Sequence, residues 1–426
     1  MEYLQIEGKQ RINGKVKVNG AKNAAVAILP AALLTEESVR IGNLPRITDI
    51  DKLVKILEAL GAKVSFTEER YLHIDSSDIY DLPPPPSLVN KFRASYYLMG
   101  VLLGRFGRVE IPMPGGCDLG PRPIDQHIKG FTALGAEVEL DHGLVKITAN
   151  KLRGAHIYLD VVSVGATINI MLAAVKAEGK TIIENVAKEP EIVDVANFLN
   201  AMGGHVVGAG TDVIKIQGVS ELGSAEHTVI PDRIEAGTFM IAAAATGGEA
   251  LITDVIPKHL DPVIAKLKEV GIILETGTDW IKVKGNNKLS STDVKTFPYP
   301  GFPTDLQAPM MVLLTQVPGT SYLTENVFEG RFRHVGELKK MGARIKLGGR
   351  TAIIEGGHEL VSAPIRATDL RGGAAFIIAG LVSCGDTILT GVEHIDRGYE
   401  DIEIRLRQLG VNLKRKTANG EIFPGK

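Results

Sequence analysis

The stretch LEALGAKV, residues 57–64, decides the fold because variants of it return five more times along the chain. In each variant the apolar end of an amphipathic helix is followed by a glycine and the start of a strand. The other five are FTALGAEV (131–138), LNAMGGHV (199–206), LKEVGIIL (267–274), LKKMGARI (338–345) and LRQLGVNL (406–413). Their glycines are spaced by 74, 68, 68, 71 and 68 residues. Glycine directly after a helix is the usual left-handed cap, which gives each repeat a physical reason for its glycine.

The segments between these stretches also follow one order. After each capped helix come a strand, a polar turn and a second strand, as in residues 145–160. A helix of nearly all apolar residues follows, as in SVGATINI (163–170), and its composition predicts that it is buried. Another strand then leads to the next amphipathic helix. The chain is therefore predicted to be an α/β protein of six β-β-α-β-α units, each of about 70 residues, with three units in each of two domains.

The two ends of the chain complement each other. Residues 411–426 leave room for only part of the strand–turn–strand, and residues 4–20 supply such a pair before the first buried helix. We therefore expect a first domain at 22–230, which carries the Cys117 loop, and a second domain formed by 1–21 plus 231–426. The active site is expected in the cleft between them.

The composition excludes several classes of protein. Lys and Arg total 48 against 50 for Asp and Glu, a formal net charge of −2, which does not favour a nucleic-acid or membrane partner. The longest apolar runs, 24–34 and 374–384, have 11 residues, fewer than the ~18 of a membrane span. The N-terminus has no signal-peptide pattern. With only two cysteines, these features predict a cytoplasmic protein in a reducing compartment.

Charged or polar residues stand where the buried helices begin, at equivalent places in the six units. They are Lys22 with Asn23, Arg93, Ser163, Arg233, Asp305, and Asp369 with Arg371. The first turn of a helix has free N–H groups and the positive end of the helix dipole, both of which favour anions. Cationic side chains there suit a phosphate or carboxylate ligand. The alternative is ordinary surface charge held in salt bridges.

The loop PGGCDLGPRPID, residues 114–125, is the second candidate region. Three glycines and three prolines in a dozen residues require special backbone geometry. Arg122 follows Cys117 by five residues, and a nearby cation lowers the pKa of a thiol and favours the reactive thiolate. Cys384 lies in the apolar run GLVSCG, so we expect it to be buried and inert.

Two further loops carry charges at matching places in the last units. FEGRF contains Glu329 and Arg331, and HIDRGYED contains Asp396 and Arg397. These are either site residues or surface charges. Glu189 in the third unit is expected to be structural or to orient cations of the site. No metal-ligand spacing, phosphate-binding loop, dinucleotide fingerprint or serine-hydrolase elbow is present in the sequence, so neither a metal nor a cofactor is predicted.

The motifs together resemble those of the UDP-N-acetylglucosamine 1-carboxyvinyltransferase family, in order and over essentially the whole chain. They are GAKNAA (20–25), RAS (93–95), PGGCDLGPRPID (114–125), SVGAT (163–167), PDRIEAGTF (231–239), FPTDLQA (302–308), FEGRF (328–332), ATDLR (367–371) and HIDRGYE (394–400). The resemblance implies an inside-out α/β barrel in each of two domains. It also implies transfer of the enolpyruvyl group of phosphoenolpyruvate to the 3-hydroxyl of UDP-N-acetylglucosamine, with release of phosphate, as the first committed step of peptidoglycan precursor synthesis.

The same resemblance implies roles for individual residues. Contacts to phosphoenolpyruvate are implied for Lys22, Asn23, Arg122, Arg371 and Arg397. Contacts to the UDP-sugar are implied for Arg93, Arg122, Pro123, Ile124, Asp125, Gln126, Ser163, Val164, Asp305 and Val327. Cys117 is implied to be the general acid of a mobile loop, able to form an adduct with the enolpyruvyl unit and alkylated by fosfomycin-type epoxides.

The reaction needs a base for the sugar hydroxyl, an acid for C3 of phosphoenolpyruvate, and cations for the departing phosphate. We assign Asp305 as the base and Cys117 as the acid. The catalytic cations are Lys22, Arg122 and Arg397. The sequence departs from some family members at Val161, where they have lysine, and from others at Gly330, where they have asparagine.

Two other functions stay open at this point. A 3-phosphoshikimate enolpyruvyl transferase would share the fold and the chemistry, although the thiol loop and PDRIEAGTF argue against it. A catalytically idle, ligand-sensing paralogue is the second, although every candidate catalytic residue is present. The expected partners are the two small-molecule substrates, with no nucleic acid and no membrane insertion, and protein partners are left open.

Overall fold

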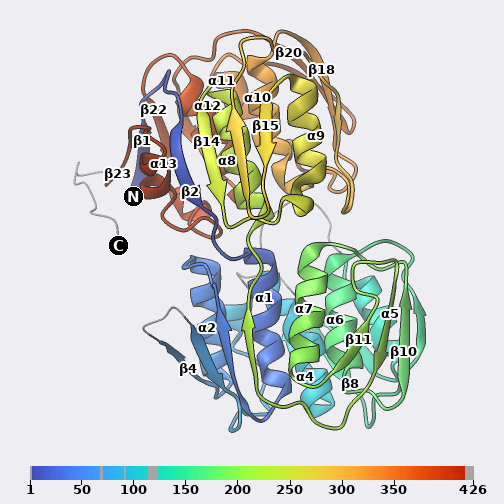
Figure 1. The fold of residues 1–426 in the computed structure, drawn as a ribbon. Coiled ribbons are helices and arrows are strands. Elements are labelled where there is room, and N and C mark those ends of the chain that lie inside the picture. Colours follow the sequence, from blue (N-terminus) through green and yellow to red (C-terminus); the bar gives the residue numbers. More distant parts are fainter. Residues whose placement is uncertain (1, 68–70, 91–92, 114–122, 418–426) are drawn as a thin grey trace. The chain divides into compact units, whose positions relative to one another are not determined.

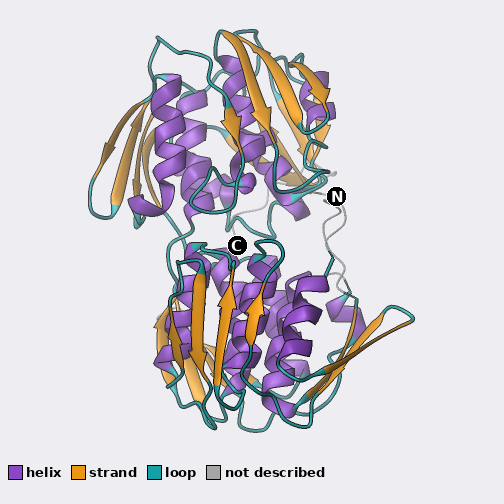
Figure 2. Cartoon of the chain, turned by 90° about the vertical axis from the view of Figure 1, so that its right-hand side faces the viewer, coloured by secondary structure: helices purple, strands orange, loops and turns teal. Residues whose placement is uncertain are grey.

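The computed structural model describes residues 2–67, 71–90, 93–113 and 123–417. The chain divides into two compact units: an N-terminal unit, Gly20–Ile230, and a C-terminal unit, Met1–Asn19 with Pro231–Lys426 (Figure 1). In each unit the helices lie together and the sheets flank them (Figure 2). The buried apolar side chains form one cluster in each unit, so each unit has its own core. No helix among the described residues is long and apolar enough to cross a membrane.

Among the described residues of the N-terminal unit, the longer helices comprise three buried and three outer ones. The buried ones are α1 (Lys22–Ala31), α4 (Tyr97–Phe106) and α6 (Val164–Ala174), and the outer ones are α2 (Thr48–Ala59), α5 (Asp125–Ala133) and α7 (Pro190–Ala201). Short turns of helix are η1 (Ala32–Leu34), α3 (Pro86–Val89) and η2 (Arg93–Tyr96). The sheets have the orders β13-β3-β5-β4, β6-β8-β7 and β11-β12-β10-β9. Their strands are β3 (Ser38–Gly42), β4 (Lys63–Phe66), β5 (Leu72–Asp75), β6 (Arg108–Pro112), β7 (Glu137–Asp141), β8 (Leu144–Thr148), β9 (His156–Tyr158), β10 (Lys180–Glu184), β11 (His205–Val207), β12 (Val213–Gln217) and β13 (Ala225–Thr228).

The C-terminal unit repeats this arrangement. Its buried helices are α8 (Arg233–Ala245), α10 (Gln307–Gln316) and α12 (Leu370–Val382), and its outer helices are α9 (Asp261–Val270), α11 (Val335–Lys340) and α13 (Ile402–Gln408). The short helical turns are η3 (Pro257–Leu260), η4 (Thr304–Leu306) and η5 (Val392–His394). The sheets have the orders β15-β16-β14-β2, β17-β18-β20-β19 and β21-β22-β1-β23. Their strands are β1 (Glu2–Ile6), β2 (Asn13–Lys17), β14 (Glu249–Thr253), β15 (Ile273–Thr276), β16 (Trp280–Lys284), β17 (Val294–Lys295), β18 (Gly319–Thr324), β19 (Arg344–Gly348), β20 (Thr351–Gly356), β21 (Pro364–Arg366), β22 (Thr387–Thr390) and β23 (Leu413–Thr417).

The six repeated glycines adopt the backbone conformation that the sequence predicts. Their φ angles are +98° at Gly61, +93° at Gly135, +96° at Gly203, +102° at Gly271, +88° at Gly342 and +80° at Gly410. A side chain at a left-handed position costs steric energy, so glycine is the residue that ends each outer helix cheaply. The prediction of six capped helices is confirmed.

The number of strands in the six repeats differs from the β-β-α-β-α pattern that the sequence predicts. Three strands, such as β7, β8 and β9, separate a capped helix from the next buried helix in most units, where two were expected. The first two pair as a tight hairpin, with only His142 and Gly143 between β7 and β8, so the sequence pattern does not separate them. The second of the six repeats lacks the third strand among the described residues. Prolines 83–86 stand there, and proline cannot donate a ladder hydrogen bond.

Two parallel strands belong to one unit but lead into a helix of the other. β2 runs beside β14, with Val16 opposite Ile252, and the chain then enters α1. β13 runs beside β3, with His227 opposite Ile41, and the chain then enters α8. Elsewhere, as with β9 and β10, the parallel strand and the buried helix that follows it stay in one unit.

The first strand joins both ends of the chain in one sheet. β1 lies between β22 and β23 and is antiparallel to both. Tyr3 is opposite Thr390 on one side and Lys416 on the other. Leu4 and Ile6, on the inner face, are fully buried. The start of the chain is therefore part of the C-terminal core.

Candidate active site

Lys22 is the first residue of α1, and a buried carboxylate holds it there. Its Nζ lies 3.0 Å from Oδ2 of Asp49 in the first turn of α2. The Asp49 side chain is 1% exposed and that of Lys22 is 14% exposed. Asn23 follows Lys22 on the same turn and is half-buried. An ordered cation at the N-terminal end of a buried helix combines side-chain charge with the positive end of the helix dipole.

Arg93 opens η2, where its guanidinium lies over the ring of Tyr96, 5.7 Å from the centroid. Burial lowers the pKa of Arg93, but an arginine side chain stays cationic at any physiological pH. The Tyr96 ring in turn meets His127 of α5 edge to face, with 5.3 Å between centroids. A Cβ on Gly165, in the first turn of α6, would lie 2.7 Å from the Tyr96 hydroxyl, so glycine is required for this close approach.

His127 is a candidate that the sequence reasoning missed. It is 5% exposed, and its two ring nitrogens have no hydrogen-bond partner in the described part of the chain. Burial, together with the charge of Arg93, lowers its pKa to about 4, so the imidazole is neutral at pH 7. The sequence did contain one signal for His127. It directly follows Gln126 of the predicted motif, and its position along the helix puts it on the inner face of α5.

Gln126 and Ser163 have structural tasks that bring two predicted segments together. The Gln126 amide accepts from the backbone N of Asp160 at 2.9 Å and donates to the Asp160 carboxylate at 3.2 Å. Ser163 caps α6 by accepting from the backbone N of Ala166 at 3.2 Å. Residues 123–126, at the start of α5, therefore lie beside residues 160–164, at the start of α6. Pro123, Ile124, Asp125 and Val164 are placed by these contacts.

The predictions for the two cysteines have different outcomes. Cys117 and Arg122 lie outside the described residues. Cys384 is exposed, so the prediction that it is buried is wrong. The apolar run that contains it belongs to α12 only as far as Val382, and the chain then turns out to the surface. There the backbone of Cys384 bonds to Leu360 and Ser362, which fixes the turn and leaves the thiol in solvent.

In the C-terminal unit Asp305 lies between two arginines. Its carboxylate is 2.7 Å from Nη2 of Arg331 and 3.1 Å from Nη2 of Arg371. Burial by itself would raise the pKa of Asp305, but Arg371 and Arg331 outweigh it and hold that pKa well below its usual range. Burial by itself would lower the pKa of Arg371, but the charge of Asp305 outweighs burial and raises that pKa. The three residues therefore form a charged cluster that carries one net positive charge.

Val327 is held near this cluster by a buried carboxylate. Glu325, 1% exposed, accepts from the backbone N of Val327 at 2.8 Å and from the hydroxyl of Thr304 at 2.8 Å. Thr304 precedes Asp305 and also accepts from Nη1 of Arg331 at 2.9 Å. The loop that carries Val327 and the turn that carries Asp305 are thus part of one hydrogen-bond network.

Three further predicted charges lie in two loops of the C-terminal unit. Arg397 is half-buried in the turn between η5 and α13. Its neighbour Asp396 is gripped by both Nη atoms of Arg415, at 2.9 and 2.6 Å. Glu329 forms an exposed ion pair with Arg350 at 2.7 Å. Of the two alternatives for Glu329, site residue or surface charge, this contact favours the surface charge.

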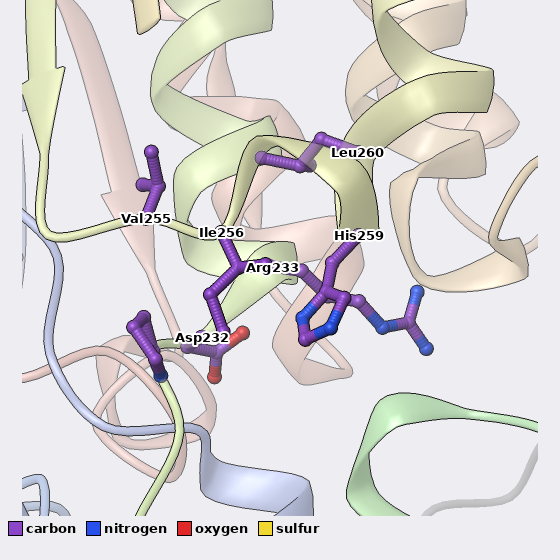
Figure 3. A pocket seen from close by; sticks show the side chains of 7 residues that line it. Asp232, Arg233, Val255, Ile256, His259 and Leu260 are labelled. Carbon is purple, nitrogen blue, oxygen red and sulfur yellow. The ribbon is translucent and has the colours of Figure 1, made fainter. Parts of the chain in front are cut away.

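Arg233, the first residue of α8, lies at a small pocket together with Asp232 and His259 (Figure 3). Its guanidinium is also 5.5 Å from the ring centroid of Tyr299. Asp232 uses its carboxylate to cap α8, accepting from the backbone N of Ile234 at 2.8 Å. One carboxylate, one guanidinium and one imidazole thus gather at the head of a buried helix, where the repeats predict charge. Among the described residues there is no group of three or more His, Cys, Asp or Glu side chains arranged to hold a metal ion.

Comparison with known proteins gives consistent matches over nearly the whole chain. The family model for EPSP synthase (3-phosphoshikimate 1-carboxyvinyltransferase) matches residues 6–406. UDP-N-acetylglucosamine 1-carboxyvinyltransferase 3 of Caldanaerobacter subterraneus is 56% identical over 415 residues, which is 97% of this chain and 99% of the relative. UDP-N-acetylglucosamine 1-carboxyvinyltransferase 2 of Bacillus subtilis is 55% identical over 422 residues, covering 99% and 98% of the two chains.

Solved structures match in the same way. The crystal structure of the enolpyruvyl transferase NikO from Streptomyces tendae has a TM-score of 0.89 at 25% identity and covers 99% of both chains. EPSP synthase from Acinetobacter baumannii has a TM-score of 0.73 at 20% identity, with 98% of this chain and 100% of the other covered, and shares the fold. The two-domain α/β arrangement predicted from the repeats is confirmed by these neighbours.

Proposed function

Since the chain belongs to the UDP-N-acetylglucosamine 1-carboxyvinyltransferases, a family of transferases within the EPSP synthase group, we propose that it transfers the enolpyruvyl group of phosphoenolpyruvate to the 3-hydroxyl of UDP-N-acetylglucosamine. The observation that carries the proposal is the identity of about 55% with relatives of this name over nearly the full length of both chains. The product would enter peptidoglycan precursor synthesis, and the enzyme would work in the cytoplasm.

The anchored cations support binding of phosphoenolpyruvate. Lys22 with Asn23, Arg371 and Arg397 are proposed to bind its phosphate and carboxylate, together with Arg122. Two of these cations are already oriented by carboxylates: Lys22 by Asp49, and Arg371 by Asp305. A cation that is fixed before the ligand arrives loses less side-chain entropy on binding, so preorganisation favours anion capture.

The UDP-sugar is proposed to contact a larger set of residues. These are Arg93, Arg122, Pro123, Ile124, Asp125, Gln126, Ser163, Val164, Asp305 and Val327. The neighbouring starts of α5 and α6 would supply most of them, with backbone N–H groups and the Arg93 charge suited to a diphosphate. Val161, which is 58% exposed, brings no cation to this place.

The proposed chemistry is addition followed by elimination. The sugar 3-hydroxyl adds to C2 of phosphoenolpyruvate while its proton passes to Asp305, and the Cys117 thiol gives a proton to C3. The Cys117 thiolate then takes a proton back from C3, phosphate leaves with the proton held by Asp305, and the double bond is restored. Asp305 is fully ionised, as a base must be. Its basicity would rise when a bound anion shares the charge of Arg371, because an opposite charge nearby is what holds its pKa down.

The test is phosphate release by the purified protein, with phosphoenolpyruvate and UDP-N-acetylglucosamine together. We expect phosphate only when both substrates are present, and none when shikimate 3-phosphate replaces the UDP-sugar. Release with shikimate 3-phosphate would assign the EPSP synthase reaction that the family model names. Release with neither acceptor, despite measurable phosphoenolpyruvate binding, would support the idle ligand-sensing alternative.

A further inference from the structure

Tyr399 is a buried tyrosine whose hydroxyl lies among the charged residues of the C-terminal unit. It is 2% exposed and lies in the turn that leads from Arg397 to α13. Its hydroxyl is 3.2 Å from Nη1 of Arg371 and 2.8 Å from Oγ1 of Thr238, in the second turn of α8. Neither Tyr399 nor Thr238 has a role in the chemistry proposed above.

The direction of each hydrogen bond follows from the number of protons available. Thr238 has one hydroxyl proton, which it donates to the backbone oxygen of Ile234 at 2.8 Å. The hydroxyl of Tyr399 must therefore donate to Thr238, and its oxygen is left to accept from the guanidinium of Arg371, which can only donate. Donation runs one way, from Arg371 through Tyr399 and Thr238 to the backbone of α8.

Arg371 is thereby held at two of its nitrogens. Nη1 is fixed by Tyr399, and Nη2 donates to Oδ2 of Asp305 at 3.1 Å. The guanidinium carbon also lies 5.6 Å from the ring centroid of Tyr399. Two anchors at different nitrogens set both the position and the plane of the guanidinium, which one ion pair would leave free to rotate.

We propose that Tyr399 is a positioning residue, which fixes Arg371 through its hydroxyl and so shares the Arg371 charge between Asp305 and an anionic substrate. This inference rests on the proposed function, in which Arg371 binds phosphoenolpyruvate. Without the hydroxyl, Nη1 loses its acceptor in a buried environment and the guanidinium turns further toward the Asp305 carboxylate. It then presents less charge to the ligand.

The test is Tyr399→Phe, which removes one oxygen atom and keeps the ring. We expect the KM for phosphoenolpyruvate to rise about tenfold or more, the usual effect of losing a buried hydrogen bond to a charged group. The KM for UDP-N-acetylglucosamine should stay within twofold. A purely structural role would lower the Tm and the active fraction, and would leave both KM values unchanged.

Two controls and one second variant sharpen this test. Thr246→Val removes another buried hydroxyl, at the C-cap of the same helix, one that donates to Ala242 and has no link to Arg371. Tyr322→Phe removes an exposed hydroxyl of β18. Both should keep the parental KM values. Thr238→Val should raise the KM for phosphoenolpyruvate, and adding it to Tyr399→Phe should cost little more, because the two residues act in one chain.

Calorimetric titration with phosphoenolpyruvate measures the binding step without turnover. If the parent releases no phosphate, the proposed function fails, yet weaker binding by Tyr399→Phe than by the parent still supports the positioning role. Parental KM and binding constants in Tyr399→Phe would overturn the inference, as would an equal loss in Thr246→Val. A parent that binds no phosphoenolpyruvate would also overturn it.

Discussion

His127 makes the stability of the N-terminal unit depend on pH in a way that can be calculated. The imidazole is buried against Tyr96 with no hydrogen-bond partner in the described residues, and burial lowers its pKa to about 4. In the unfolded chain its pKa returns to about 6.5. Between these values the unfolded state binds a proton that the native state does not. Stability is therefore complete above pH 6.5 and is lost as the pH falls toward 4.

The size of the effect follows from the two pKa values. At pH 5 the difference in proton binding amounts to about 2 kcal/mol, and the full span of the shift corresponds to about 3.4 kcal/mol. His127→Phe cannot titrate and keeps an aromatic ring against Tyr96. It should therefore remove this pH-dependent loss. It also removes two unpartnered buried nitrogens, so at pH 7.5 it should leave stability unchanged or raise it by about 1 kcal/mol.

The assay is hydrogen exchange of the core amides of α6 and β8, with rates corrected for the intrinsic effect of pH. Parent and His127→Phe are compared at pH 7.5 and 5.0, and His205→Gln, at an exposed histidine of the same unit, serves as the matched control. The control should lose about as much protection at pH 5.0 as the parent. An equal loss in His127→Phe would refute the reasoning, since the titrating group would then be another residue.

Four further outcomes are expected. The C-terminal unit should change less between pH 6.5 and 4.5. His334 destabilises the native state as the pH falls through this range, because burial lowers its pKa to about 4 and only the unfolded state takes up the proton. Glu235 offsets this, because burial raises its pKa to about 7 and the native state holds a proton that the unfolded state binds only near pH 4.5; hydrogen-exchange protection in α10 checks this. Iodoacetamide should label Cys384 in the folded protein, by peptide mass mapping, and Cys384→Ala should keep parental phosphate release. Asp305→Asn should lower kcat at least a hundredfold in the phosphate-release assay, and its Tm should fall because two buried arginines lose their carboxylate. Deleting residues 1–17 should reduce hydrogen-exchange protection in β22 and β23, which lose the strand between them, more than protection in α6.

The repeated parts of the fold can be predicted from the sequence because their causes are local. A glycine after the apolar end of a helix usually serves as a left-handed C-cap, and all six examples have the left-handed backbone that the pattern requires. The missing strand at the end of the sixth unit points to the start of the chain in the same way, and β1 lies between β22 and β23. Counting equivalent elements is enough for this, without any knowledge of side-chain contacts.

Other features depend on contacts between distant residues, and one sequence does not contain them. The apolar run before Cys384 predicts burial of the thiol, but α12 ends at Val382 and the turn after it faces solvent. The helix-head positions identify Asp305 and Arg371 as candidates, yet nothing in their spacing indicates that they pair. His127 and Tyr399 were overlooked because a buried histidine or tyrosine looks like any other core residue until its neighbours are known.

The place of β1 has a consequence for how the protein is made on the ribosome. Tyr3 is translated long before its partner Thr390, which follows roughly 390 residues later. At about 5–20 residues per second, β1 waits roughly 20–80 s before β22 and β23 exist. The strands of the N-terminal unit are complete once Thr228 has been translated, while this apolar strand is still without its sheet. In the nascent chain, the N-terminal unit can thus be folded while β1, which precedes it, is unpaired and prone to aggregate. A holding chaperone would be most useful in this state.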